Sequence, residues 1–480
     1  MSRTVIIGGG IAGLATAFYL QACGLRDFTL IERSDTPGGK ITSHEENGFL
    51  VEGGPDSFLA QRSVMRDFCQ VLGLEDQLAG SSTGTDATTY VWSAGRLHPM
   101  PEGMMLMAPT MLAPFLRSSL ISWPGKARMG MEFFVPRNRT REDESLASFV
   151  RRRLGTEALN KIAGPLMAGI HAADPERLSL QSTFPMFLQM EQTHGSLLRA
   201  MVKRQPPKHS ATGAKPSSTF LTLRGGLQQL ANSIVERLPL GSVRCGRSVV
   251  QVQRGTYGYK VLLDDGSLLI ADDVVFATPA YITADLLQQI DPLLSTKLRS
   301  IRYVSTATVS LGFRKSDVRR ELRGSGFIVP RSEGRRITAC SWSSQKFPHR
   351  APEGNVLMRV FVGGALAESD AEQSEAALVQ LAREELRAIL GITAEPVLAK
   401  AYRWHKASPQ YEVGHQARIQ EIELCLTTFP GLHLAGAAYH GAGIPDCIQS
   451  AMQAVRAIAD RRTAMDFAGD QQTAHARPGA

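Results

Sequence analysis

The chain has 480 residues, of which 43% are hydrophobic and 20% are charged, and it carries a net charge of +8. At about 100–200 residues per domain, this length predicts two to four domains with sizeable buried cores, and the composition excludes collagen-like, disordered and disulfide-scaffold proteins. The sequence has no zinc-finger pattern and no dense Lys/Arg tract, so its positive charge favours an anionic ligand or an acidic membrane surface over nucleic acid.

The first elements predict a βαβ unit. Residues 4–7 form a β-branched run, apolar residues at helical spacing follow from Leu14, and residues 28–31 form a second apolar strand. The glycine motif of residues 8–13 stands between the first strand and the helix, and Glu32 follows the second strand, 19 residues after Gly13. In this context the G-x-G-x-x-G motif is a strong fingerprint of dinucleotide binding, whereas the motif alone is weak.

Each residue of this fingerprint has a physical role. Gly8 makes the tight turn, Gly10 lets the backbone approach a pyrophosphate, and Gly13 allows close packing of helix and strand. The helix N-terminus offers unpaired N–H groups to the phosphates. Glu32 can accept hydrogen bonds from a ribose diol and repels a 2′-phosphate.

Downstream, patterns of hydrophobicity and turn residues predict a helical region, a loop, several strands and a C-terminal helix. The expected elements are helices within 97–205, a Pro-rich loop at 206–218, strands at 249–252, 259–263 and 273–277, an antiparallel sheet within 300–365, a helix at 371–390, a strand at 432–436, a helix at 448–459 and a frayed tail at 465–480.

Three features bear on the compartment. The apolar N-terminus contains a glycine triplet and lacks a cleavage site, so we interpret it as folded structure rather than a signal peptide. Residues 103–123 approach the length of a membrane span, but Pro109, Pro114 and Arg117 interrupt them. The six cysteines are scattered and include no C-x-x-C pair, which is typical of a reducing compartment. We expect a cytoplasmic protein, with a peripheral membrane contact left open.

Two further features favour FAD over a nicotinamide cofactor. Residues 37–42 (Pro-Gly-Gly-Lys-Ile-Thr) place two glycines and a cation soon after Glu32. Residues 435–448 supply a second glycine-rich strand–turn–helix near the C-terminus. A helix N-terminus there can stabilise negative charge on a reduced flavin. A nicotinamide domain is normally one continuous block, whereas these pieces lie at both ends of the chain.

From residue 3 to about 460 the sequence resembles the FAD-dependent protoporphyrinogen/coproporphyrinogen oxidases, within the wider amine-oxidase-like flavoproteins. Within that family it is most similar to the bacterial coproporphyrinogen III oxidase branch. The strings that carry the resemblance are residues 8–13 with Glu32, 38–41, 52–59, 97–101, 164–174, 182–185, 404–405, 409–415 and 443–448.

The resemblance implies an α/β fold, α+β overall: a discontinuous Rossmann-like FAD-binding domain, a substrate domain with an antiparallel sheet, and a helical insertion. On this basis the expected segments are 1–96, 219–285 and 402–464 for the FAD domain, 97–205 for the helical insertion, 206–218 for a loop, 286–401 for the substrate domain and 465–480 for a disordered tail.

Carried over by position, the resemblance implies a set of FAD-binding residues. They are Gly8, Gly9, Gly10, Ile11, Ala12 and Gly13 for the phosphates, Glu32 with Arg33 at the ribose, Lys40 near the diphosphate, Gly54, Pro55, Asp56 and Ser57 along the flavin, Val249 at the adenine, and Trp404, Ile444, Pro445 and Asp446 around the isoalloxazine.

The implied reaction is the six-electron oxidation of coproporphyrinogen III to coproporphyrin III, with dioxygen as acceptor and hydrogen peroxide as product, in haem biosynthesis. The resemblance places Gly169 against the substrate, and we expect Arg62 to contact a substrate propionate, although a solvated surface arginine is an equally good interpretation of that position. No metal is expected. The product can be handed to a ferrochelatase; the oligomeric state stays open.

Other chemistry-bearing residues have simpler interpretations. The run Arg151, Arg152 and Arg153 predicts a solvated helix face. His171 and His440 could accept protons near a flavin, but packed or hydrogen-bonded histidines are commoner. The methionines within 100–111 predict core or tunnel lining rather than a metal site.

Three alternative functions remain at this stage. Protoporphyrinogen IX is the nearest alternative substrate, and net charge does not decide between the two porphyrinogens. An amine oxidase or carotenoid desaturase of the same fold is disfavoured by residues 164–174 and 443–448. A flavin-binding protein without turnover, serving as a partner for assembly or haem transfer, is the third.

Overall fold

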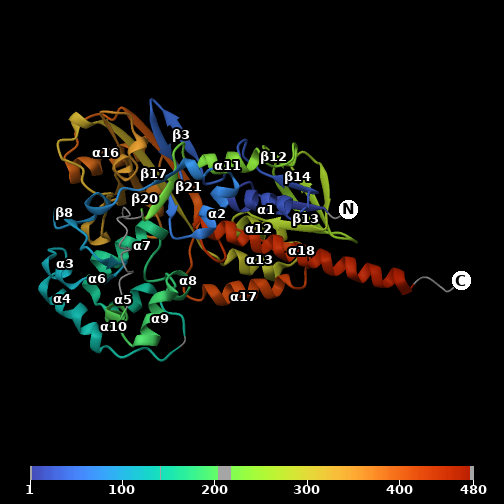
Figure 1. Cartoon of the computed structure of the whole chain (residues 1–480), viewed down its shortest axis with the longest axis horizontal. Helices are drawn as coiled ribbons and strands as arrows, with labels where there is room; N and C mark the ends of the chain where they lie inside the picture. The colour runs from blue at the N-terminus through green and yellow to red at the C-terminus, as the bar shows by residue number, and fades with distance from the viewer. Residues whose placement is uncertain (1–2, 141, 204–217, 476–480) are drawn as a thin grey trace.

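The computed structural model describes residues 3–140, 142–203 and 218–475. Figure 1 shows three parts: an α/β part that contains the N-terminus, a strand-rich part around β17 and β20, and a helical part from α3 to α10. The predicted combination of a Rossmann-like unit, an antiparallel sheet and a helical insertion is confirmed.

The α/β part is built on a five-stranded parallel sheet in the order β12-β2-β1-β16-β22. Its central strands are buried at every position, as expected where helices or a second sheet cover both faces of a parallel sheet. The strands are β1 (Thr4–Ile7), β2 (Phe28–Ile31), β12 (Val243–Arg244), β16 (Asp273–Phe276) and β22 (Leu432–Leu434).

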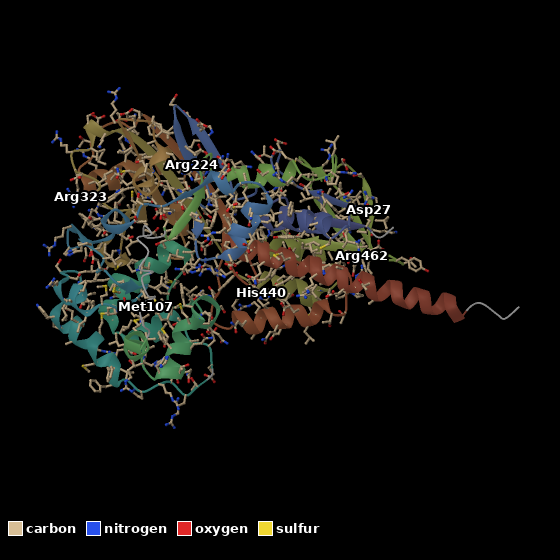
Figure 2. All side chains as sticks on the ribbon, viewed as in Figure 1. Asp27, Met107, Arg224, Arg323, His440 and Arg462 are labelled. Carbon is tan, nitrogen blue, oxygen red and sulfur yellow. The ribbon has the colours of Figure 1, made fainter. Side chains whose placement is uncertain are left out.

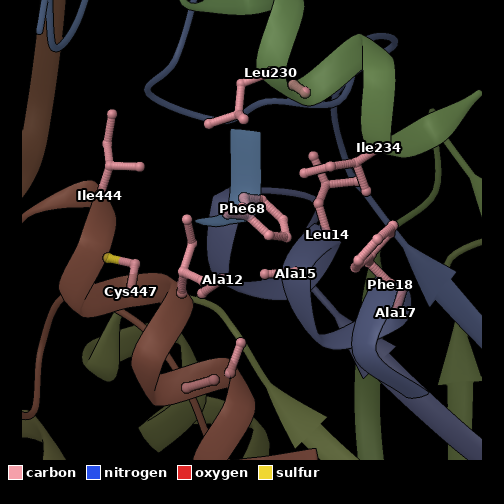
Figure 3. Close-up of a cluster of buried hydrophobic side chains, with 14 of the residues drawn as sticks. Ala12, Leu14, Ala15, Ala17, Phe18, Phe68, Leu230, Ile234, Ile444 and Cys447 are labelled. Atoms are coloured by element: carbon pink, nitrogen blue, oxygen red, sulfur yellow. The ribbon is translucent and has the colours of Figure 1, made fainter. Parts of the chain in front are cut away.

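One face of this sheet packs on helices from distant parts of the chain. Figure 3 shows Ala12 of α1 near Phe68 of α2 and Ile444 of α18, and Leu14 of α1 below Ile234 of α11. The helices are α1 (Ile11–Ala22), α2 (Ser63–Val71), α11 (Gln228–Val235) and α18 (Ile444–His475). The packing places the N-termini of α1 and α18 on the same side of the molecule.

The opposite face packs on a small antiparallel sheet and three helices, which share one buried core with β1 and β16. These elements are β13 (Val249–Arg254), β14 (Tyr259–Leu263), β15 (Leu268–Ala271), α12 (Ala280–Leu287), α13 (Pro292–Arg299) and α17 (His415–Leu426). Ile6 and Val5 face opposite cores, because successive side chains of a strand alternate between its faces.

The second large sheet has seven strands in the order β21-β17-β20-β19-β18-β7-β8, antiparallel throughout except between β18 and β7. Helix α16 (Glu375–Leu390) shares its core. The strands are β7 (Thr89–Ser93), β8 (Arg96–Pro99), β17 (Tyr303–Arg314), β18 (Gly326–Ile328), β19 (Ile337–Ser341), β20 (Asn355–Gly363) and β21 (Leu398–Pro409). The expected segment ends at 96 and 401 therefore fall beside or inside strands of this sheet, because β7 and β21 pair with strands from the middle of the chain.

The helical part encloses a Met- and Leu-rich core that includes the fully buried Met107 (Figure 2). Its elements are α3 (Leu112–Arg117), α4 (Trp123–Gly130), the 3₁₀ turn η3 (Met131–Phe134), α5 (Leu146–Arg153), α6 (Thr156–Ala158), the π turn η4 (Leu159–Ala163), α7 (Gly164–His171), α8 (Leu180–Thr183), α9 (Pro185–His194) and α10 (Leu197–Lys203). The first residues of the predicted helical region are instead β8 and the short strands β9 (Met104–Met105) and β10 (Ala108–Pro109).

Small elements complete the described chain. They are β3 (Ser43–Glu46), β4 (Phe49–Glu52), β5 (Phe58–Leu59), β6 (Leu78–Gly80), β11 (Phe220–Leu223), α14 (Ser343–Lys346), α15 (Glu368–Ala371) and the 3₁₀ turns η1 (Glu75–Gln77), η2 (Gly84–Ala87), η5 (Lys315–Asp317), η6 (Arg331–Glu333) and η7 (Pro348–Arg350).

The arginine run of α5 corrects a prediction. Only Arg151 lies on a solvated face, where it pairs with Glu176. Arg153 is fully buried and forms ion pairs with Glu132 and Glu191, which are also fully buried. The prediction of a solvated face was wrong for Arg153, because its partners come from segments that no local pattern connects to α5.

The C-terminal end also differs from its prediction. The tail expected over 465–480 is helical as far as His475, because α18 begins at Ile444 and continues for 32 residues. Figure 2 shows Arg462 on this helix, and its guanidinium contacts the buried Asp273 at the start of β16. Residues 476–480 and almost all of the predicted loop 206–218 lie outside the described residues.

Candidate cofactor site

The glycine motif adopts the geometry that the fingerprint requires. Gly8 has φ +106°, and a Cβ on Gly13 would lie 1.9 Å from the carbonyl oxygen of Gly8. Neither position tolerates a side chain, because α1 must pack directly against the first strand. A Cβ on Gly10 would instead meet nothing within 4 Å. The N-terminus of α1 therefore faces open space, which suits the approach of a diphosphate.

Residues 37–40 pass across this turn. The N–H of Gly38 donates to the carbonyl of Gly9 at 2.8 Å, and a Cβ on Gly39 would lie 3.0 Å from the Cα of Gly10. Lys40 is solvent-accessible, yet surrounding protein desolvates its ammonium group and lowers its pKa. The Lys40 ammonium donates to the carbonyl of Ala407 at 2.8 Å, and its role near the diphosphate stays a prediction.

Glu32 directly follows β2, beside the glycine motif. Its carboxylate accepts hydrogen bonds from the N–H groups of Gly9, at 2.5 Å, and Ser34, at 2.8 Å. Its backbone carbonyl accepts from the N–H of Arg247, two residues before Val249 on β13. The predicted ribose and adenine residues are therefore neighbours across two sheets. The remaining predicted residue here, Arg33, is exposed.

The loop of residues 53–57 connects β4 to β5 and is held by the seven-stranded sheet. The carbonyl oxygen of Gly53 accepts three hydrogen bonds, from Thr308 Oγ1 at 2.9 Å, Trp404 Nε1 at 2.9 Å and Arg359 Nη2 at 3.1 Å. Arg359 also donates to the carbonyl of Gly54. A Cβ on Gly54 would lie 1.8 Å from the carbonyl oxygen of Lys40, so this loop lies directly against the Lys40 segment.

Asp56 anchors the other end of the same loop. Lys346 Nζ lies 3.1 Å from both carboxylate oxygens, and the Ser57 hydroxyl donates to one of them at 2.7 Å. Burial alone would raise the pKa of Asp56, but the charges of Lys346 and Arg359 and these hydrogen bonds hold it well below its usual value. Asp56 is therefore ionised at neutral pH.

The N-terminus of α18 completes this side of the site. Ile444 and Pro445 are buried, and the Asp446 carboxylate accepts from the N–H of Gly443 at 3.2 Å. The guanidinium of Arg62, at the start of α2, lies 3.0 Å from Asp446 and is half exposed. The structure thus places the predicted propionate contact beside a predicted flavin-pocket residue; its role toward substrate stays a prediction.

Gly169 lies near the C-terminal end of α7 and faces the seven-stranded sheet. A Cβ there would lie 3.9 Å from Ile328 Cγ2 of β18. The next residue, Ile170, is 56% exposed despite its apolar side chain. The ring of His171 packs edge-on against Phe184, and burial lowers its pKa to about 4. This stretch offers an apolar surface and a neutral imidazole, which suits a flat, largely apolar substrate.

Sequence reasoning missed Thr308, Lys346 and Arg359, which hold the loop of residues 53–57. Arg359 carried a signal, since it is the one charged residue in the apolar run 356–362 of β20. A charged residue inside a buried strand is expected to have a dedicated partner. Thr308 and Lys346 carried no such signal.

The comparisons with known proteins agree with this site. The flavin containing amine oxidoreductase family matches residues 11–459. The chain belongs to this family. It is thus a flavin-containing oxidoreductase with FAD as its cofactor, and the residues fit that group, because the open position at Gly10 beside the N-terminus of α1 has room for a diphosphate.

The resemblance to the porphyrinogen oxidases is confirmed by curated relatives. Coproporphyrinogen III oxidase of Bacillus subtilis (strain 168) is 40% identical, with 94% of this chain and 97% of the relative covered. The enzyme of the same name from Staphylococcus aureus is 33% identical, with 96% and 100% covered. Chloroplastic protoporphyrinogen oxidase of Oryza sativa is 29% identical, with 96% and 88% covered.

Solved structures support the same fold. A crystal structure from Exiguobacterium sp. 255-15, named for protoporphyrinogen oxidase, has a TM-score of 0.84 at 33% identity and covers 95% of this chain and 98% of its own. Cyclohexylamine oxidase from Brevibacterium oxydans has a TM-score of 0.69 at 15% identity, with 96% and 99% covered, and shares the fold. Among the described residues, no helix has the length and apolarity of a membrane span, and no group of three or more His, Cys, Asp or Glu side chains could hold a metal ion.

Proposed function

We propose that this flavoenzyme oxidises coproporphyrinogen III to coproporphyrin III, with dioxygen as acceptor and hydrogen peroxide as product, in haem biosynthesis. The observation that carries the proposal is the 40% identity, over nearly the whole chain, to an enzyme named for that substrate. The 33% identity to the enzyme of the same name from Staphylococcus aureus supports the same choice.

When bound, FAD supplies a two-electron acceptor, and three rounds of oxidation convert a porphyrinogen to a porphyrin. The N-terminus of α1 binds the diphosphate and Glu32 binds the ribose. Thr308, Trp404 and Arg359 fix the loop of residues 53–57 through the Gly53 carbonyl, so that the loop presents one geometry to the flavin. Burial lowers the pKa of His171 to about 4, so its imidazole stays neutral and is a weak proton acceptor at neutral pH.

The substrate proposal predicts a selective effect of Arg62→Ala. Coproporphyrinogen III carries four propionates and protoporphyrinogen IX carries two, so removal of a charge-assisted contact worth about 1.5–3 kcal/mol raises the KM for coproporphyrinogen more than for protoporphyrinogen. Porphyrin fluorescence in air, corrected for autoxidation, measures both. Arg66→Ala, an exposed arginine on the same helix, is the control and leaves both KM values unchanged. Equal effects of Arg62→Ala on both substrates would remove Arg62 from the substrate site.

The wild-type enzyme tests the proposal itself. A higher kcat/KM for coproporphyrinogen III supports it, and a higher value for protoporphyrinogen IX would assign the chain to the other substrate. A yellow protein that turns over neither would be a flavoprotein of another activity. Handover of the product to a ferrochelatase is a further proposal, which co-purification of the two proteins tests.

We also propose that the segment of residues 111–134 contacts an anionic membrane surface. This apolar segment exposes large side chains that a soluble surface would normally bury: Met111, Leu112, Leu116, Trp123, Met131, Phe133 and Phe134. Lys126 of α4 donates to the carbonyl of Leu116 in α3, which joins the two helices. Residues 103–140 contain five cations and a single acid, the buried Glu132, so the charge complements acidic headgroups.

Vesicle sedimentation tests this contact. The wild-type protein is expected to sediment with phosphatidylglycerol vesicles, and the double variant Trp123→Ser/Phe134→Ser is expected to lose ~10-fold or more in affinity, since each side chain contributes about 1.5–3 kcal/mol when buried. Leu240→Ser, which alters a fully exposed leucine elsewhere, retains wild-type binding. Wild-type protein that stays in the supernatant, or a double variant that binds as wild type does, would contradict the proposal.

A further inference from the structure

Five ionisable side chains lie beneath the loop of residues 53–57 and form what we call the loop cluster. They are Glu52, Asp56, Lys346, Arg350 and Arg359, with side-chain exposures of about 20% or less. Arg350 pairs with Glu52 at 2.7 Å and Lys346 pairs with Asp56 at 3.1 Å. Three cations face two carboxylates, so the cluster holds one excess positive charge.

Arg359 carries that excess. Its guanidinium donates to the carbonyls of Gly53 and Gly54, which neutralise no charge. Its Nε is buried and has no hydrogen-bond partner among the described residues. Burial lowers the pKa of Arg359, while Asp56 and Glu52 raise it, and an arginine remains charged at neutral pH even so.

Two further titratable groups beside the cluster, His349 and Tyr402, add no charge to it. His349, next to Arg350 in the sequence, has a pKa lowered to about 4 by burial and by Arg350 and Arg224, so it is neutral. The Tyr402 phenol, which interacts with both Glu52 and Arg359, has a raised pKa because of burial and nearby acids and is also neutral. A buried charge acts at low effective dielectric and is poorly screened by salt.

We infer that Arg359 sets the reduction potential of the bound flavin through the loop that it holds. The inference rests on the proposed role of residues 54–57 along the flavin. FAD held by these residues would take up a hydride, which carries two electrons and one proton, from a carbon of the substrate and would become an anion, while a pyrrole nitrogen of the substrate would release a proton. The excess positive charge of the loop cluster stabilises that anion and so raises the potential. Arg359 is a positioning residue for the loop and an electrostatic residue for the cofactor.

The test measures the midpoint potential of the purified holoenzyme with a reference dye, in the absence of porphyrinogen. Arg359→Gln keeps a donor for the Gly53 carbonyl and removes the charge. We expect it to shift the reduction equilibrium at least 10-fold toward oxidised flavin, which is about 30 mV for a two-electron couple. Arg359→Lys keeps the charge and stays within about threefold of wild type.

Two substitutions that remove charges of opposite sign separate an electrostatic effect on the potential from a structural one. Asp56→Asn removes an acid and is expected to raise the potential, whereas Lys346→Gln removes a cation and is expected to lower it. A variant that only damaged the loop would not shift the potential in a direction that depends on the sign of the charge removed. Arg336→Gln, in an exposed ion pair with Asp370, leaves the potential unchanged.

The outcomes are distinct. If Arg359→Gln fails to retain flavin, the directions in which Lys346→Gln and Asp56→Asn shift the midpoint potential still test the inference. Unchanged potentials, or shifts of one common sign in flavin-bound variants, would overturn the inference. Expected shifts in an enzyme that oxidises no porphyrinogen would overturn the proposed substrate and leave the electrostatic role of Arg359 in place.

Discussion

Replacing Gly10 with valine is expected to give a folded protein that holds no flavin. A Cβ at Gly10 meets nothing within 4 Å, and the backbone there has φ −70° and ψ 177°, which valine adopts without strain. The added side chain fills only the space that a diphosphate needs at the N-terminus of α1. Loss of two charge-assisted hydrogen bonds, at about 1.5–3 kcal/mol each, is enough to bleach the purified protein.

Absorbance at 450 nm and far-ultraviolet circular dichroism measure this result together. Gly130→Val is the matched control, because a Cβ on this exposed glycine of α4 also meets nothing within 4 Å, and it retains stoichiometric flavin. A Gly10→Val variant with wild-type flavin content would exclude the glycine turn as the diphosphate site. Gly13→Val differs from both, since its Cβ collides with the Gly8 carbonyl and is expected to impair folding itself.

The second large effect is on stability. Arg153→Met is expected to lower the free energy of unfolding by about 3–5 kcal/mol, because it leaves the fully buried Glu132 without its cation and the fully buried Glu191 paired with Arg152 alone. Glu132 is held by more than the arginine: it also accepts from the N–H groups of Leu197 and Leu198 and from the Ser196 hydroxyl. Arg153 therefore joins α5 to the start of α10 through one buried acid.

Urea unfolding followed by circular dichroism measures this change. Arg151→Met, two residues earlier on the same helix, removes an exposed pair with Glu176 and is expected to cost about 0–1 kcal/mol. Similar losses in the two variants would show that the buried network contributes no more than a surface ion pair.

The parts of the site that lie close together in the sequence were predictable from it. Residues 4–32 contain a strand, a glycine turn, a helix and a second strand whose hydrogen bonds and packing are local. Their glycines stand where the backbone geometry admits no other residue, as at Gly8 and Gly13. The family strings extended this prediction to Lys40, Trp404 and the start of α18.

The contacts that join distant segments were not predictable. Arg359 and Lys346 reach the loop of residues 53–57 across about 300 positions of chain, and no periodicity records which carbonyl or carboxylate they meet. The same holds for Arg62, whose ion pair with Asp446 joins α2 to the N-terminus of α18. The sequence alone identifies these residues only as charged side chains, because their partners are known only from the fold.

The sequence by itself determined the dinucleotide turn, the alternation of α/β and antiparallel regions, and the membership of a flavin enzyme family, because each depends on local backbone geometry or on strings of neighbouring residues. The tertiary structure alone decided that Arg153 is buried, that β7 and β21 share one sheet, and that Arg359 places an uncompensated charge beneath the loop of residues 53–57. Burial and charge pairing depend on which segments meet in space, and that is a property of the whole fold.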